Sequence, residues 1–208
     1  MTDAANQLSR RAFGGSVIAL GALAATRAVA APAMTAESVM GPFYPTGYAG
    51  EDDFDLTMLK GRPARALGDV IEVSGRVLDR LGNPVSGAKI ELWQANAMGR
   101  YAHVNDTSSA ALDPNFQGVA RLVTGPSGEW RIKTIRPNLY GRRTRHIHFD
   151  VAGRAHRLMA QMYFPEDAET NASDGLYRML GERAATSLAR LEAPDTYRWD
   201  IVLMDAGQ

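Results

Sequence analysis

Two histidines separated by a single residue are the clearest chemical signal in this 208-residue sequence. His146 and His148 lie within the predicted strand 145–149, where they alternate with Ile147 and Phe149, which are expected to face the apolar core. Alternate residues of a strand point to the same face and lie about 6–7 Å apart, so both imidazoles could bind one metal ion. Tyr140, just upstream, is a candidate third ligand. The alternative is that both histidines lie on the surface of an edge strand.

Composition restricts what such a metal site could be. The chain contains no cysteine, which excludes disulfides, zinc–thiolate sites, iron–sulfur clusters and cysteine nucleophiles. Any metal must therefore be bound through nitrogen and oxygen. Two further histidines, His103 and His156, leave open a three-histidine zinc site that activates water. The formal net charge is zero, and because proteins that bind nucleic acid are usually basic, no nucleic-acid partner is expected.

The first 30 residues have the organisation of an export signal. Arg10 and Arg11 precede an uncharged stretch rich in alanine, glycine and leucine at 14–25, and Ala28 and Ala30 form a small-x-small cleavage pattern. The paired arginines resemble a twin-arginine signal; a Sec signal or an uncleaved anchor is the alternative. We expect export to the periplasm or the extracellular space, no stable membrane span in the mature form, and a single domain at 31–208.

The rest of the chain has the pattern of an all-β protein. Short stretches with a period of two, separated by glycine and proline turns, predict an antiparallel β-sandwich of about seven or more strands. One helix is expected at 175–191, where apolar residues recur every three or four positions, and a hairpin turn at 125–128. The long segments 35–67 and 98–118 lack periodicity and are expected to form the active-site loops. The expected strands are 70–77, 88–94, 121–124, 129–135, 145–151, 158–164 and 197–204.

A second tyrosine ends a distinctive decapeptide that runs off the strand at 88–94. Residues 92–101 read Leu-Trp-Gln-Ala-Asn-Ala-Met-Gly-Arg-Tyr. This stretch resembles the intradiol ring-cleaving catechol dioxygenases, and most closely their protocatechuate dioxygenase branch. The resemblance extends in order from about Gly41 to Leu203. It also includes the segments 41–44, 112–118, 134–137, 143–149 and 161–164.

The resemblance implies one non-haem Fe(III) ion per chain. Its ligands would be Tyr101, Tyr140, His146 and His148, all of which the chain retains. Phenolates are hard anions that stabilise the +3 state of iron, and two imidazoles complete the set. A free phenol has a pKa of about 10, so the adjacent ferric ion would be what ionises the tyrosines.

The implied reaction cleaves a catechol-type ring between its two hydroxylated carbons with O2, giving a cis,cis-muconate-type product. Tyr140 would leave the metal and accept a catechol proton, whereas Tyr101 would remain bound. Arg143 matches the family arginine that stabilises negative charge on the ring, and Gln161 matches a glutamine of the pocket.

Three aromatic residues, Phe43, Tyr44 and Trp93, are either substrate-binding walls or ordinary core packing. Only two residues separate Tyr140 from Arg143, fewer than in protocatechuate enzymes. The identity of the catechol therefore cannot be transferred from the family. Association into a homo-oligomer is expected by analogy. The alternative from another class is an exported β-sandwich that binds carbohydrate or another ligand without catalysis.

Overall fold

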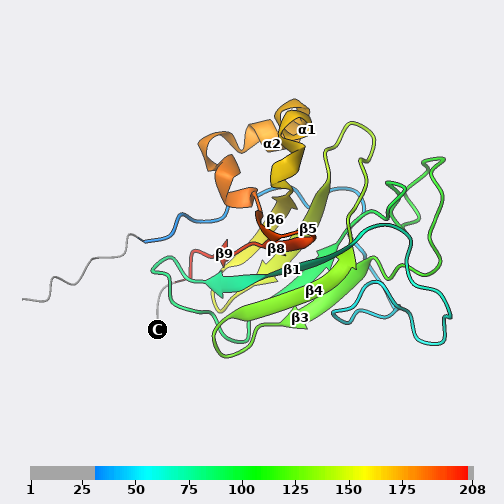
Figure 1. The fold of residues 1–208 in the computed structure, drawn as a ribbon. Helices are drawn as coiled ribbons and strands as arrows, with labels where there is room; N and C mark the ends of the chain where they lie inside the picture. Colours follow the sequence, from blue (N-terminus) through cyan, green and yellow to red (C-terminus); the bar gives the residue numbers. More distant parts are fainter. Residues whose placement is uncertain (1–30, 206–208) are drawn as a thin grey trace, which may run out of the picture. The chain divides into compact units, whose positions relative to one another are not determined.

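The computed structural model describes residues 31–205 (Figure 1), so the predicted signal at 1–30 lies outside the described residues. Within the described range, no helix has both the length and the hydropathy needed to cross a bilayer. The elements are β1 Val70–Leu78, β2 Lys89–Trp93, β3 Val119–Val123, β4 Glu129–Ile135, β5 His146–Ala152, β6 Arg157–Tyr163, the 3-10 helix η1 Pro165–Asp167, α1 Ala168–Ser173, α2 Gly175–Met179, the 3-10 helix η2 Gly181–Ser187, β7 Arg190–Ala193, β8 Thr196–Arg198 and β9 Ile201–Val202.

The strands form two sheets, which confirms the predicted sandwich. One sheet has the order β3-β2-β5-β6, and the other has the order β4-β1-β8-β7 with β9 also paired to β1. The four-stranded sheet is antiparallel throughout, as expected. The second sheet is mixed, because β8 and β9 run parallel to β1. Parallel neighbours need a long connection, and here the chain between β1 and β8 includes the whole other sheet.

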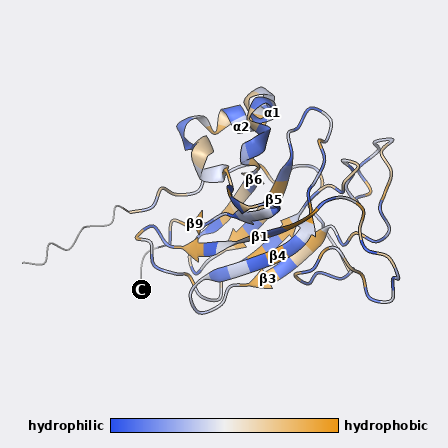
Figure 2. Cartoon of the chain, in the orientation of Figure 1, coloured by the Kyte–Doolittle hydropathy of each residue, from blue (hydrophilic) through white to orange (hydrophobic). Residues whose placement is uncertain are grey.

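The core lies between the two sheets. Burial alternates along β1, and its inward residues include Val73. From the opposite sheet, the ring of Phe149 lies 5.3 Å from Trp130 and 4.9 Å from Trp199, measured between ring centroids. Figure 2 shows hydrophobic and hydrophilic residues mixed along single strands, as expected when a strand has one core face. Because one face of each sheet packs in the core, the outer face of the four-stranded sheet is free to carry a site.

Three local predictions were wrong, the first being the single strand at 197–204, which is divided into β8 and β9. The turn at 125–128 joins β3 to β4, which belong to different sheets, so it is a sheet-to-sheet connection and not a hairpin. The helix predicted at 175–191 is α2 followed by η2, and Leu191 lies in β7. Gly181, the first residue of η2, adopts a φ of +58°, a left-handed conformation that interrupts a right-handed helix. One short α-helix and a 3-10 helix thus replace the single helix expected.

The outer face of the four-stranded sheet carries the residues singled out above. In register across it lie Val119, Trp93, His148 and Gln161, from β3, β2, β5 and β6. The apolar residues Phe43 and Tyr101 of the long loops pack on this face around Trp93.

The two long loop regions are also joined to each other. The Gln117 side-chain amide donates to the carbonyl of Asp53 at 2.8 Å, and the Leu67 amide donates to Asp113 at 2.7 Å. Figure 1 shows the cyan and green loops on the same side of the domain. The loops expected to build a site therefore gather together.

Candidate metal centre

The two histidines lie side by side in the interior of the sheet. β5 runs between β2 and β6, so it is not an edge strand. His146 and His148 are 3% and 4% exposed, and their Nε2 atoms are 3.2 Å apart. The alternative of two surface histidines is therefore wrong. Ile147 and Phe149 point into the core, as the alternation predicted.

His146 is oriented by the backbone. Its Nδ1 lies 2.6 Å from the carbonyl oxygen of Thr144, and because a carbonyl only accepts, Nδ1 carries the hydrogen. In the neutral ring, Nε2 then presents a lone pair. Burial, followed by the positive charge of Arg143, lowers the pKa of His146 to about 4. The imidazole is thus kept neutral and directed as a metal ligand requires.

His148 is held by packing. Its ring stacks on Trp93 with centroids 4.8 Å apart and an interplanar angle of 7°. On the strap 36–48, a carbon added at Gly41 would lie 3.2 Å from Cε1 of His148, so the backbone itself approaches the ring. Burial lowers the pKa of His148, with smaller contributions from His146 and Arg143. Among residues 31–205, its buried Nδ1 has no hydrogen-bond partner.

Tyr101 is brought to the histidines by the decapeptide. Its hydroxyl lies 3.3 Å from Nε2 of His146, and its backbone amide donates to Asp106 at 2.8 Å. The turn before it is organised by Asn96, whose side-chain oxygen accepts from the amides of Met98 and Arg100, both at 2.9 Å. Burial, offset in part by the charge of Arg143, raises the pKa of Tyr101 above its usual value.

The loops that carry the two tyrosines touch at a glycine. Gly99 has a φ of +76°, and any side chain there would overlap the carbonyl of Leu139. The amide of Asn138 also donates to the carbonyl of Asn96 at 3.1 Å. As a result the rings of Tyr101 and Tyr140 lie 5.6 Å apart, centroid to centroid, and almost perpendicular at 89°.

Tyr140 is the more accessible tyrosine. Its side chain is half-buried, and its pKa is raised by burial and then by the negative charge of Asp106. The short segment after it is a tight turn in which the Arg143 amide donates to the Tyr140 carbonyl at 2.8 Å. Gly141 allows this turn with a φ of +56°.

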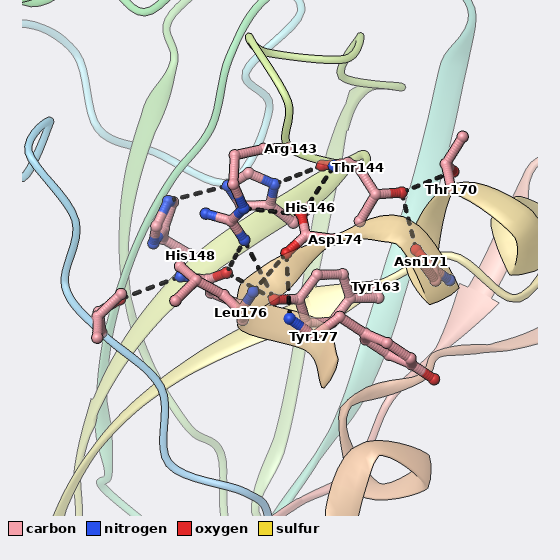
Figure 3. Close-up of polar contacts among 12 residues, drawn as sticks. Arg143, Thr144, His146, His148, Tyr163, Thr170, Asn171, Asp174, Leu176 and Tyr177 are labelled. Carbon is pink, nitrogen blue, oxygen red and sulfur yellow. Dashed lines mark hydrogen bonds and ion pairs between the residues drawn. The ribbon is translucent and has the colours of Figure 1, made fainter. Parts of the chain in front are cut away.

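Arg143 and Gln161 are in direct contact. Nη2 of Arg143 donates to Oε1 of Gln161 at 2.6 Å, and the hydroxyl of Tyr163 donates to the same oxygen at 2.8 Å. Figure 3 shows the guanidinium beside the two imidazoles. The structure thus brings both predicted polar residues to the histidine pair.

The three aromatic candidates have different surroundings. Phe43 packs against Tyr101 and Tyr140, with centroids 4.7 and 5.1 Å away. Phe43, Trp93 and Tyr101 line a cavity of about 220 Å³. Tyr44 is absent from this lining; its ring meets the edge of Trp93, and its hydroxyl donates to Glu91 at 2.6 Å.

The three-histidine zinc site is not formed. His103 lies against Phe43, with centroids 5.7 Å apart, and lines the cavity. His156 lies in the turn between β5 and β6, where its Nδ1 accepts from the amide of Met204. In the described part of the chain, no three histidine, aspartate or glutamate residues cluster as metal ligands would.

The donor set nevertheless fits a hard, highly charged cation. Two neutral imidazoles present Nε2 atoms to each other, and the Tyr101 hydroxyl lies within 3.3 Å of one of them. Such convergence of ligand atoms on one small volume is what a metal requires. Because carboxylates are missing from the donor set, negative charge must come from phenolate oxygen, which favours Fe(III) over softer ions.

Several residues around the site were not foreseen from the sequence. Thr144 fixes His146, Gly41 approaches His148, and Asp174 and Tyr163 contact Arg143. Gly41, Thr144 and Tyr163 lie within the segments 41–44, 143–149 and 161–164 that carry the family resemblance, whereas Asp174 lies in none of the matching segments. None of these segments indicates which distant residue it meets.

Comparisons with known proteins agree with this geometry. The sequence profile of the family described as Dioxygenase matches residues 39–205. The beta chain of protocatechuate 3,4-dioxygenase from Burkholderia cepacia is 40% identical over 179 residues, which cover 78% of this chain and 76% of that protein. Catechol 1,2-dioxygenase from Acinetobacter baylyi is 27% identical over 149 residues, 60% of this chain and 44% of that one.

A solved structure is also similar. It is the dioxygenase domain of a dioxygenase carbohydrate-binding protein fusion from Streptomyces sp. SirexAA-E, with a TM-score of 0.63 and 27% identity, covering 84% of this chain and 100% of that one. The sandwich, the paired histidines with the nearby tyrosines, and these matches have one explanation: the chain belongs to the intradiol dioxygenase family.

Proposed function

We propose that the protein is a non-haem Fe(III) intradiol dioxygenase, which cleaves a catechol-type ring between its hydroxylated carbons with O2. The observation that carries the proposal is the convergence of two buried imidazoles and the Tyr101 hydroxyl, with Tyr140 beside Tyr101. Membership of the family supplies the class of reaction.

Four side chains would hold the metal: Tyr101, Tyr140, His146 and His148. Fe(III), when bound, supplies Lewis acidity toward the two catechol oxygens. Tyr101 would be the permanent phenolic ligand, since it is 3% exposed and its backbone is fixed by Asp106. Tyr140 would be the more readily displaced ligand, because it is half-buried, and its Oη would accept a proton from the incoming catechol.

The surrounding residues orient the ring and exclude water. Arg143 donates hydrogen bonds toward the negative charge that develops on the substrate. Phe43 and Trp93, 6% and 1% exposed, limit solvent access to the ligands. Such exclusion strengthens the electrostatic interactions inside the site.

The test is the iron-loaded mature chain assayed against a panel of catechols. We expect one iron per chain, a red-brown colour from tyrosinate, O2 consumed in equal amount to the catechol, and a muconate-type product. Stoichiometric zinc with no visible absorption would contradict the proposal. A colourless protein without O2 uptake would favour the alternative, a binding module without catalysis.

We also propose export by the twin-arginine route, with cleavage near Ala30. The support is the arrangement of Arg10, Arg11 and the small residues before position 31. Replacing both arginines with lysine should leave the precursor in the cytoplasm, whereas undiminished export would point to the Sec route.

Association of the mature chain into an oligomer is a further part of the proposal. Relatives named as alpha and beta chains of protocatechuate 3,4-dioxygenase both match this chain. Sedimentation of the purified mature chain should give a mass above that of one chain. A single-chain mass across the concentration range would contradict it.

A further inference from the structure

Asp174 is a fully buried carboxylate at the junction between α1 and α2, with 0% exposure. Both of its oxygens are engaged. Oδ1 accepts from the backbone amides of Leu176 at 2.8 Å and Tyr177 at 3.1 Å. Oδ2 accepts from Nε of Arg143 at 2.7 Å and from the amide of Thr144 at 2.9 Å (Figure 3).

This carboxylate is ionised in spite of its burial. Burial raises the pKa of Asp174, but the hydrogen bond from Arg143 and those from the amides of Tyr177 and Thr144 outweigh it, so the pKa lies below its usual value. A buried ion pair stabilises a protein only if its remaining hydrogen bonds are also satisfied. Asp174 caps the start of α2 by accepting from the amides of Leu176 and Tyr177. This role does not need a partner cation, so it does not explain the ion pair with Arg143.

The pairing fixes the guanidinium along two edges. Nε donates to Asp174, while Nη2 donates to Gln161 at 2.6 Å and to the hydroxyl of Tyr163 at 3.2 Å. Gln161 is itself held, since its Nε2 donates to the carbonyl of Val39 at 3.1 Å. Within residues 31–205, Nη1 is the one guanidinium nitrogen of Arg143 that has no hydrogen-bond partner.

The ion pair also changes what Arg143 can offer. The negative charge of Asp174, 2.7 Å from Nε of Arg143, partly offsets the positive charge of the guanidinium, although that charge still lowers the pKa of His146. The ion pair also makes Arg143 a hydrogen-bond donor of fixed direction. Fixed donors cost no reorganisation when charge develops on a substrate, which is the basis of electrostatic stabilisation in enzymes.

The same carboxylate holds the turn that precedes the histidine pair. Thr144 donates its amide to Asp174, and its hydroxyl is bound to Thr170 at 2.9 Å and Asn171 at 2.8 Å. The carbonyl of Thr144 accepts from Nδ1 of His146. The position of Asp174 is therefore transmitted to His146 through one residue.

We propose that Asp174 is a positioning residue of this site, which fixes Arg143 as an oriented hydrogen-bond donor and anchors the turn that directs His146. The kinetic test of this inference rests on the proposed dioxygenase activity. The structural test, by hydrogen–deuterium exchange, does not depend on that activity.

The first test is a double-mutant cycle on the iron-loaded enzyme with Asp174→Asn, Arg143→Met and the double variant. We expect Asp174→Asn to lower kcat/KM by about 10–100-fold, the usual cost of losing such an outer partner, with most of the loss in kcat and iron content maintained. In the Arg143→Met background, the same change should cost less than twofold, because residues that act together are not additive. An equal loss in both backgrounds, or full activity of Asp174→Asn, would overturn the proposal.

Asp79 provides the matched control. It is 3% exposed and, like Asp174, accepts two backbone amides, those of Leu81 and Asn83, both at 2.8 Å. It lies in the turn after β1 and has no arginine partner within residues 31–205. Asp79→Asn should cost stability but leave kcat within twofold of wild type. A kcat loss as large as that of Asp174→Asn would mean that the effect is merely one of fold stability, and would overturn the proposal.

Arg143→Lys is the second variant, and it tests the proposal if Asp174→Asn fails to fold. It leaves a cation in the sequence that can still pair with the buried carboxylate of Asp174. Lysine retains the charge but cannot reproduce the planar fork that binds Asp174 and Gln161 together. We expect at least a tenfold loss of kcat with unchanged iron content. A wild-type kcat would show that charge and not orientation matters, which contradicts the proposal.

Hydrogen–deuterium exchange separates this inference from the proposed function. In wild-type protein, the Thr144 amide should be protected through Asp174, and Asp174→Asn should raise its exchange by at least tenfold relative to Asp79→Asn. This holds whether or not the protein turns over catechols. Unchanged exchange at Thr144 would overturn the positioning role even in an active dioxygenase.

Discussion

Tyr140 and Arg143 form the two ends of a single tight turn, in which the Arg143 amide donates to the Tyr140 carbonyl at 2.8 Å. A second bond runs from the Tyr140 amide to the Arg143 carbonyl at 3.3 Å, so the proposed proton acceptor and the proposed hydrogen-bond donor are joined by two residues and two backbone hydrogen bonds. Arg143 is also paired with the buried Asp174, so the turn has one fixed end. The backbone thus holds Tyr140 next to the anchored Arg143, while its side chain stays half-buried.

The two tyrosines should respond differently to loss of the hydroxyl. Tyr140→Phe should still bind iron, because three protein ligands and solvent can fill the coordination sphere of the metal. A visible absorption band from Tyr101 should persist in this variant. Its turnover should fall by roughly 10²–10⁴-fold, the usual contribution of a general base. Tyr101→Phe should instead raise the reduction potential and weaken retention of Fe(III). Iron content, absorption and O2 uptake distinguish the two, and wild-type turnover by Tyr140→Phe would refute its role as a base.

Gly41 and Gly47 offer a matched pair of substitutions on the strap over the site. Both have positive φ, +75° and +70°, but only at Gly41 would an added carbon meet His148. Alanine at either position should cost about 1–2 kcal/mol from the left-handed backbone. Only Gly41→Ala should also shift the visible band and lower iron affinity. Equal spectra for the two variants would mean that the strap does not press on His148.

Gly99 should be essential for bringing the tyrosines together. Gly99→Ala cannot be accommodated without moving the loop at Leu139, since the new carbon would overlap its carbonyl. Loss of bound iron is expected because Tyr101 and Tyr140 move apart. Gly87→Ala is the control, since Gly87 has a φ of +74° and open space around it. If iron content stayed at wild-type level in Gly99→Ala, the contact between these loops would not matter for the metal.

Acid stability should depend on Asp79. Burial raises the pKa of this carboxyl, but hydrogen bonds from Asn83 and Leu81 outweigh it, so the folded pKa lies below its usual value. A depressed carboxyl pKa stabilises the fold above the unfolded pKa, and this stabilisation is lost as pH falls through the folded pKa. The difference in unfolding free energy between wild type and Asp79→Asn should be largest near pH 6–7 and shrink below about pH 4. Denaturant titrations across this range measure it, and a difference that grew on acidification would have the wrong sign.

Much of the candidate site could be predicted because its signals are local. The alternation of a strand places His146 and His148 on one face and Ile147 in the core, whatever the rest of the chain does. The Trp-Gln-Ala-Asn to Gly-Arg-Tyr stretch combines a strand end and a turn, and Asn96 and Gly99 have local conformational roles. Phe43 and Tyr44 show the limit of such signals. They are neighbours, yet Phe43 reaches the cavity and Tyr44 reaches Glu91.

Contacts between distant residues were decided by the tertiary structure. Arg143 meets Asp174, 31 residues away, and Gln161 meets Val39, 122 residues away. No sequence pattern encodes these pairs, because they depend on which strands become neighbours and how the loops cross them. The sequence alone determined the strand faces, the candidate ligand residues and the family resemblance. The tertiary structure decided that the histidines are interior, that one is held by a carbonyl and the other by stacking, and that Arg143 is paired with a buried carboxylate. The physical reason is that periodicity reports only the environment of a residue along its own strand, whereas partners across the fold follow from the packing of the whole domain.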